Sequence, residues 1–112
     1  MDSVIDHSWG KEIIFAKTSE YDGKINLFEQ PDSTMPFTIY KDRDSTWFIN
    51  AGKFVLTLID PSTGKMQTKE LNEGDVFRCT PMVPYQIKSL VANSSYTEVG
   101  NGKDSKSLLS ET

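Results

Sequence analysis

The sequence predicts one all-β domain, a jelly-roll β-barrel, and three observations support this prediction. Short apolar runs rich in Thr, Val, Ile and aromatic residues recur along the chain with turn residues between them, which is typical of β-strands. No 3.6-residue periodicity continues for more than two turns, so long helices are not favoured. The length of 112 residues suits one domain and is too short for two ordinary ones.

The N-terminal part predicts a first pair of strands. Residues 11–17 and 24–30 are separated by TSEYDG, in which Asp22-Gly23 is a strong turn signal. The following segment, 31–36, holds two prolines, which cannot lie in a central strand.

The middle of the chain predicts a second hairpin, because residues 45–50 and 53–60 flank Ala51-Gly52. Beyond it, the turn sequences DPSTGK and NEGD separate shorter apolar runs. The strands expected in the second half are residues 66–71, 76–79, 85–90 and 95–100.

Composition and charge exclude several classes of function. We assign residues 1–100 to the domain and residues 101–112 to a polar, loosely held C-terminal tail. A net charge of -4 without a basic cluster argues against a nucleic-acid partner. No apolar run approaches the roughly 20 residues of a membrane span, and the polar start MDSVIDHSWGKE is unlike a secretory signal. With a single cysteine and so no internal disulfide, we expect a cytoplasmic protein.

The stretch EGDVFRCTPMVPYQI, residues 73–87, resembles the second sequence motif of the cupin superfamily. In that motif a Gly-Asp turn opens a strand, a proline-rich loop follows, and a metal-binding histidine comes directly after the last proline. Gly74 and Asp75 match the turn, and Pro84 matches the last proline. Tyr85 stands where the resemblance places the histidine.

The stretch TIYKDRDSTWFINAG, residues 38–52, resembles the first cupin motif. Counting back from its closing glycine places Thr38 and Tyr40 at two histidine positions and Ser45 at a glutamate position. Counting forward from the preceding strand places Asp44 there instead, and both registers stay open. The segments HSWGKEIIFAK and EYDGKINLF extend the likeness to small single-domain cupins related to the isomerase part of mannose-6-phosphate isomerase and mannose-1-phosphate guanylyltransferase enzymes.

The ligand positions implied by the resemblance predict a cupin without metal or cofactor. Neutral imidazole and carboxylate groups bind first-row metals well. Threonine, serine and a phenol with a pKa of about 10 must lose a proton to bind comparably. The single histidine, His7, and the single cysteine, Cys79, cannot build a zinc site of four nitrogen or sulfur ligands.

The same positions predict a ligand site in the barrel interior. Strand alternation points the side chains of residues 38 and 40 to the same face of their strand, and likewise those of residues 45 and 47. In the cupin register these side chains and that of residue 85 share the barrel interior. Hydroxyl groups beside aromatic walls suit a sugar or another small polar ring compound. Arg78 is added as a contact for a phosphate or carboxylate on such a ligand. The predicted ligand-binding residues are Thr38, Tyr40, Ser45, Trp47, Arg78 and Tyr85.

The leading hypothesis is a metal-free cupin that binds a small, carbohydrate-like molecule without turning it over, so no catalytic residue is assigned. One alternative is a metal-independent sugar or sugar-nucleotide isomerase or epimerase, in which Glu98 would serve as general base if it faced inward. Another is a structural dimerisation module with a filled barrel. A homodimer is expected in every case, because exposed sheet edges are commonly protected by pairing between subunits.

Five residues receive simple structural interpretations. The run Asp42, Arg43, Asp44 is expected to be a solvated turn. Cys79 is expected to be a buried, inert thiol, because the only histidine is remote in sequence. The N-terminal segment with His7 is expected to pack across the barrel or across a dimer.

Overall fold

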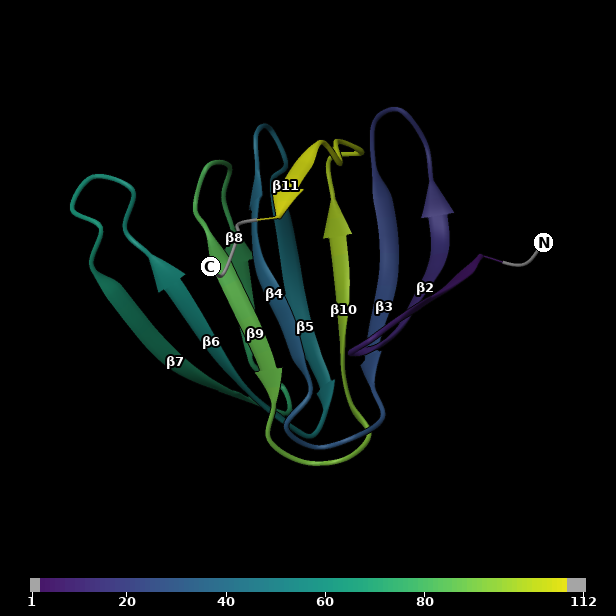
Figure 1. Cartoon of the computed structure of the whole chain (residues 1–112). Coiled ribbons are helices and arrows are strands. Elements are labelled where there is room, and N and C mark those ends of the chain that lie inside the picture. Colours follow the sequence, from purple (N-terminus) through teal and green to yellow (C-terminus); the bar gives the residue numbers. More distant parts are fainter. Residues whose placement is uncertain (1–2, 109–112) are drawn as a thin grey trace.

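The computed structural model describes residues 3–108, and within them the chain is all-β without a helix (Figure 1). No helix capable of crossing a membrane is therefore found in that part of the chain. The strands are β1 (Val4–His7), β2 (Gly10–Lys17), β3 (Asp22–Phe28), β4 (Thr34–Tyr40), β5 (Ser45–Ala51), β6 (Lys53–Ile59), β7 (Met66–Asn72), β8 (Val76–Cys79), β9 (Tyr85–Ser89), β10 (Ser94–Gly100) and β11 (Lys106–Leu108).

The strands form two antiparallel sheets that together make a jelly roll. The six-stranded sheet has the order β1-β2-β3-β10-β5-β8, and the five-stranded sheet has the order β11-β4-β9-β6-β7. In Figure 1 the strands of both sheets run in similar directions, with β1–β3 on one side of the molecule and the β6–β7 hairpin on the other. The all-β jelly-roll fold predicted from the sequence is confirmed.

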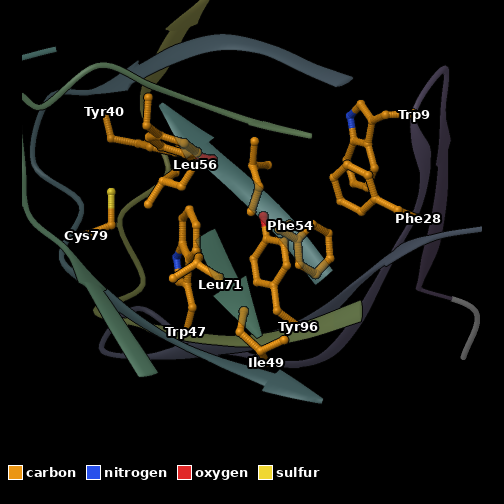
Figure 2. Packing of buried hydrophobic residues seen from close by; sticks show 12 residues of the cluster. Trp9, Phe28, Tyr40, Trp47, Ile49, Phe54, Leu56, Leu71, Cys79 and Tyr96 are labelled. Carbon is orange, nitrogen blue, oxygen red and sulfur yellow. The ribbon is translucent and has the colours of Figure 1, made fainter. Parts of the chain in front are cut away.

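The aromatic core lies between the two sheets (Figure 2). Strand alternation brings Trp47 and Ile49 from β5, Tyr96 from β10 and Phe54 from β6 into it, all fully buried. The ring of Tyr96 stacks on Trp47 at a centroid distance of 4.7 Å and meets Phe54 edge-on at 5.4 Å. Such aromatic pairs add specific contacts to the hydrophobic burial.

Two predicted turns differ from the structure. Asp22 and Gly23 already belong to β3, and the turn before it is closed by Thr18, whose Oγ1 accepts from the backbone N–H groups of Glu20 and Tyr21. Strands β5 and β6 form a corner between the sheets, not a hairpin, because each pairs within a different sheet.

Three strands lie where the sequence predicted none or left the structure open: β1, β4 and β11. Strand β4 holds Pro36 although it lies between β11 and β9, and this is possible because its pairing with β9 is irregular between Met35 and Thr38. In the predicted C-terminal tail, Lys106–Leu108 form β11 on the edge of the five-stranded sheet, and residues 109–112 lie outside the described part.

Candidate functional site

A polar cavity of about 210 Å³ lies between the two sheets, beside the aromatic core. The six-stranded sheet and the turn after β1 contribute mainly charged and amide groups, whereas the five-stranded sheet contributes mainly phenols and apolar groups. The principal lining residues are His7, Trp9, Glu12, Lys24, Asn26 and Glu98 from the first sheet, and Met35, Pro36, Thr38, Tyr40, Tyr85 and Lys106 from the second.

Glu98 forms part of the wall of this cavity and is only 2% exposed. Strand β10 lies between β3 and β5, and the register places Glu98 opposite Lys24 on one side and Trp47 on the other. Its Oε1 accepts a hydrogen bond from Asn26 Nδ2 at 3.1 Å, and its Oε2 accepts one from Arg43 Nε at 2.9 Å. Glu98 therefore faces inward, a point that strand alternation alone left open.

Arg43 is buried, 2% exposed, although it lies in the short connection between β4 and β5. Its guanidinium donates to both carboxylate oxygens of Asp22, at 2.6 and 2.9 Å, to Glu98, and to the carbonyl of Lys103. A glycine at position 100 makes room for it, because a Cβ on Gly100 would lie 2.7 Å from Arg43 Cζ. The expectation of a solvated turn is wrong for Arg43, since acceptors from distant strands satisfy it.

The two carboxylates keep Arg43 charged, and Arg43 keeps Asp22 charged. Burial by itself would lower the pKa of Arg43, but the hydrogen bonds and charges of Asp22 and Glu98 outweigh burial and raise this pKa. Burial by itself would raise the pKa of Asp22, and Arg43 again outweighs it, so that the pKa of Asp22 falls below its ordinary value.

A second row of polar side chains, Lys24, Glu12 and His7, crosses the cavity wall from β3 through β2 to β1. Lys24 Nζ lies 2.7 Å from Glu12 Oε2, and His7 Nε2 lies 2.9 Å from Glu12 Oε1. The ring of His7 stacks on Trp9 at a centroid distance of 4.6 Å, so the N-terminal strand is attached to the barrel by an aromatic and a polar contact. The expectation that this segment packs across the barrel is consistent with these contacts.

Neighbouring charges also determine the ionisation of Lys24 and Glu12 in this row. Burial by itself would lower the pKa of Lys24, but Glu98, Tyr40 and Glu12 outweigh burial and raise it. For Glu12, burial alone would raise the pKa, whereas Lys24 and His7 lower it below the ordinary value. Lys24 and Glu12 are therefore an ammonium and a carboxylate at neutral pH.

Three of the six predicted ligand-binding residues, Thr38, Tyr40 and Tyr85, line this cavity together. The rings of Tyr40 and Tyr85 stack at a centroid distance of 6.5 Å and an interplanar angle of 17°. Burial raises the pKa of Tyr40 and places that of Tyr85 well above its ordinary value, with Glu98 adding to both shifts. The Thr38 hydroxyl donates to the Pro36 carbonyl at 2.9 Å, so it is already engaged.

The other three predicted residues lie away from the cavity. Trp47 is fully buried in the aromatic core, and its Nε1 donates to Ser45 Oγ at 3.2 Å. Arg78 faces solvent with a side chain 65% exposed and binds both carboxylate oxygens of Asp44 at 3.0 and 2.6 Å. The geometry therefore gives Trp47 and Ser45 a packing role and Arg78 a surface ion pair.

Sequence interpretation missed most of the charged residues of the site. In the strand segment KINLF, alternation places Lys24 and Asn26 on the same inward face as Phe28, and this polar-inward pattern was the available signal. No comparable local signal exists for Arg43, because its partners come from β3 and β10. The thiol of Cys79 is buried as expected, and burial raises its pKa to about 12.

The hydroxyl of Tyr96 is buried, and Tyr96 belongs to the aromatic core and not to the residues that line the cavity. Tyr96 lies opposite Asn26 on β3, one inward position from Glu98. Its Oη has no hydrogen-bond partner among the described residues. A buried hydroxyl without a partner costs stability, so Tyr96 contributes an unsatisfied polar atom to the core.

The residues present do not fit a transition-metal site of the cupin type. Thr38 has its hydroxyl engaged, and the raised pKa values of Tyr40 and Tyr85 oppose formation of the phenolate that a metal would need. Within residues 3–108, no group of three or more His, Cys, Asp or Glu side chains is placed to hold a metal ion.

Comparison with solved structures supports the fold assignment. The chain is similar to Lactobacillus farciminis oxalate decarboxylase (TM-score 0.81, 16% identity, 96% of this chain and 34% of that one). It is also similar to a mutant of Bacillus subtilis oxalate decarboxylase OxdC (TM-score 0.83, 13% identity, covering 96% and 30%). A third similar structure is CapF with an inhibitor (TM-score 0.79, 13% identity, covering 95% and 33%).

These neighbours have the cupin fold, so the cupin jelly roll expected from the two motifs is confirmed. The chain spans about a third of the length of these three proteins. No protein-family model and no curated protein matches the chain. The closer likeness to the isomerase part of the mannose enzymes stays a prediction.

Proposed function

We propose that this cupin-fold domain binds a small, carbohydrate-like molecule in the polar cavity without turning it over. The observation that carries the proposal is the cavity itself, in which buried Glu98 and Asn26 and half-buried Lys24 face Tyr40 and Tyr85 across the space between the sheets. Buried polar groups reduce stability unless they are satisfied, and a hydroxyl-rich ligand would supply further partners.

The size of the cavity narrows the class of ligand. About 210 Å³ is below the roughly 300–1,000 Å³ of pockets that hold drug-sized molecules. One sugar ring, or a molecule of similar size, fits this volume better than a nucleotide sugar. An adjoining cavity of about 220 Å³ shares Glu12, Lys24, Tyr40 and Lys106 with the first, which leaves room for a substituent.

The absence of turnover is proposed because the groups around the cavity are engaged or poorly matched to proton transfer at neutral pH. Both carboxylate oxygens of Glu98 accept hydrogen bonds from Asn26 or Arg43. Lys24, Tyr40 and Tyr85 have raised pKa values, so they hold their protons firmly. An efficient general acid or base has a pKa near the working pH.

Two alternatives each have one observation in their favour. Inward-facing Glu98 in a cavity with Tyr40 favours an isomerase or epimerase, with the carboxylate as base. The fully buried rings of Trp47 and Tyr96 favour a structural module with a filled barrel.

The deciding experiment is a thermal-shift screen of sugars, sugar phosphates and nucleotide sugars, followed by calorimetric titration of any compound that stabilises the protein. Lys24→Met should weaken binding, because it removes the ammonium donor while keeping most of the side-chain volume. Arg78→Met removes a cation outside the cavity and serves as the matched control. If no compound in the screen stabilises the protein, the structural module with a filled barrel is favoured. If NMR detects conversion of a bound sugar, the isomerase is favoured.

The homodimer is also proposed, with the outer face of the six-stranded sheet as its interface. One row of side chains crosses all six strands of this face, and all but one of its members are apolar. The row consists of Val4, Ile13, Ile25, Thr97, Phe48 and Val76, paired in that order by the strand registers.

A second copy of this chain is the occupant that the dimensions favour. Six strands about 4.8 Å apart give a face roughly 24 Å wide, and seven residues give it a length of roughly 23 Å. The flat area of such a face is at most about 550 Å², since β1 and β8 have only four residues each, and projecting side chains bring its accessible surface closer to the roughly 800 Å² that each partner buries in a stable complex. Phe48 and Val76 are 48% and 63% exposed, which is unfavourable in a monomer.

Sedimentation tests the dimer directly. Phe48→Lys should convert a dimer to a monomer, whereas Met66→Lys, on exposed β7, should not. A wild-type chain that sediments as a monomer at all accessible concentrations would refute this proposal. A cytoplasmic location, without nucleic-acid or membrane partners, stays a prediction.

A further inference from the structure

The charges around the two adjoining cavities are balanced within the protein. Four cationic and four anionic side chains line the two spaces, with His7 counted as neutral. With one exception, each of these charges has an opposite charge within 4 Å. The pairs are Lys24–Glu12 at 2.7 Å, Arg43–Asp22 at 2.6 Å, Arg43–Glu98 at 2.8 Å and Lys17–Asp104 at 3.2 Å.

The exception is Lys106, which is exposed on the edge strand β11. Solvent screens a charge at that position, so it attracts an anion inside the cavity only weakly. Buried Arg43 and half-buried Lys24 are both committed to carboxylates. Nothing in the described part of the chain therefore offers an uncommitted buried cation to an anionic ligand.

We infer that the site selects an electrically neutral, hydroxyl-rich ligand, such as an unphosphorylated monosaccharide unit, and discriminates against sugar phosphates and sugar acids. This inference rests on the proposed function and specifies the charge of its ligand. An anion placed here would lie beside Glu98 and Glu12 in a poorly solvated space, where like charges repel strongly.

The paired groups still have hydrogen-bonding capacity, and its mixture of donors and acceptors matches hydroxyl groups. Lys24 has three N–H donors, of which one is directed to Glu12. Glu98 Oε1 accepts from Asn26 alone among the described residues, although a carboxylate oxygen has two acceptor sites. A sugar hydroxyl both donates and accepts, so it can bind between an ammonium and a carboxylate that already neutralise each other.

The phenols on the opposite wall are consistent with the same selection. Tyr40 and Tyr85 keep their protons, so they add donors without adding charge.

The test compares three probes of similar size by calorimetric or NMR titration: a methyl hexoside, a hexose 6-phosphate and a hexuronate. The hexoside should bind at least about tenfold more tightly than either anion, because no buried counter-charge is available. Its affinity should be unchanged between about 0.02 and about 0.5 M NaCl, since no net charge is neutralised on binding.

The outcomes separate this inference from the proposed function. Equal or tighter binding of the phosphate or the uronate, weakening with salt, would overturn the inference and leave the proposed binding function in place. Failure of all three probes, and of the wider screen, would overturn the proposed function and this inference with it.

A substitution tests whether the internal pairing sets the selectivity. Glu12→Gln releases Lys24 from its carboxylate while keeping the side-chain size and a hydrogen-bond acceptor. The variant should bind the phosphate or uronate about tenfold better than the wild type does. Asp44→Asn makes the same change of charge at an exposed ion pair with Arg78 and should leave all three affinities unchanged.

Retention of wild-type selectivity by a folded Glu12→Gln protein would overturn the inference. A thermal melt of each variant checks the fold. If Glu12→Gln fails to fold, Lys24→Met tests the same ion pair by removing its cation instead of its carboxylate. That variant leaves Glu12 uncompensated, so it should discriminate against both anions more strongly than the wild type, and weaker discrimination would count against the inference.

Discussion

The aromatic core and the polar cavity are built by the same strands, yet they contribute unequally to stability. Strand β10 carries Tyr96 into the core and, two residues later, Glu98 into the cavity wall. Strand β3 does the same with Phe28 and Lys24. Burial of the aromatic rings stabilises the fold, whereas buried ion pairs roughly break even against their lost hydration.

This difference is the pattern expected if the cavity is the ligand site proposed above. A barrel selected only to fold would gain by replacing the paired charges with packed apolar residues. Local departures from good packing and apolar cores are expected at functional sites. The polar cavity is such a departure, and the core beside it is the part that offsets it.

The largest expected effect on stability comes from removing a large side chain from the aromatic core. Trp47→Ala should reduce the free energy of unfolding by about 3–5 kcal/mol, because it removes a fully buried ring and leaves a cavity. Urea denaturation measures this, with Met66→Ala on the exposed strand β7 as the control. A loss below about 1 kcal/mol would mean that the core is not tightly packed.

Breaking the charge network should be nearly as costly. Arg43→Met leaves Asp22 and Glu98 buried without their counter-charge and should cost about 3 kcal/mol of unfolding free energy. Arg78→Met breaks a hydrogen-bonded pair of similar geometry in solvent and should have no measurable effect. Similar losses for the two variants would show that burial does not distinguish them.

A smaller effect is expected from acid. The pKa values of Asp22 and Glu12 are lowered in the folded state, so their contribution is fully present above the ordinary carboxyl values of about 3.9–4.3. It is lost as the pH falls through the lowered, folded-state values. The free energy of unfolding should therefore be steady near pH 6 and decline below about pH 4. Arg43→Met, which removes the main partner of Asp22, should make that decline shallower, and an unchanged decline would contradict the assignment.

A single hydroxyl in the cavity should affect binding and leave stability nearly unchanged. Tyr85→Phe should weaken binding of the methyl hexoside by about 0.5–1.5 kcal/mol. Tyr21→Phe, at a position 56% exposed, is the matched control. Calorimetric titration measures both variants, and equal affinities for wild type and Tyr85→Phe would remove Tyr85 from the site.

The smallest expected effect is on metal content. Protein purified without chelator should carry no stoichiometric transition metal, and Tyr85→His should not change this, because it adds one ligand to a set that lacks the others. Elemental analysis measures the content. One zinc, iron, nickel or manganese per chain, lost when Thr38 or Tyr40 is replaced, would contradict the prediction.

The candidate site was predictable only in part, and the division follows the range of the interactions. Tyr40 and Tyr85 were found because each follows a motif of neighbouring residues, and both line the cavity. Trp47 was predicted to bind the ligand because strand alternation places it on the inward face with Ser45. Its inward direction leads into the core instead. Strand alternation determines which face of a sheet a side chain occupies. It does not determine how deeply the side chain lies beneath the opposite sheet.

The sequence by itself determined the all-β class, most of the strands and the cupin jelly roll, because alternation, turns and the two motifs are properties of short segments. The tertiary structure decided the polar cavity. Asn26 is 72 positions from Glu98, and Arg43 is 55 positions from it, so their contacts depend on which strands become neighbours. A charged residue in a turn or at a strand end looks solvated in the sequence. Arg43 obtains its two carboxylates and its burial only because β3 and β10 become neighbours in one sheet and the β4–β5 connection lies against them.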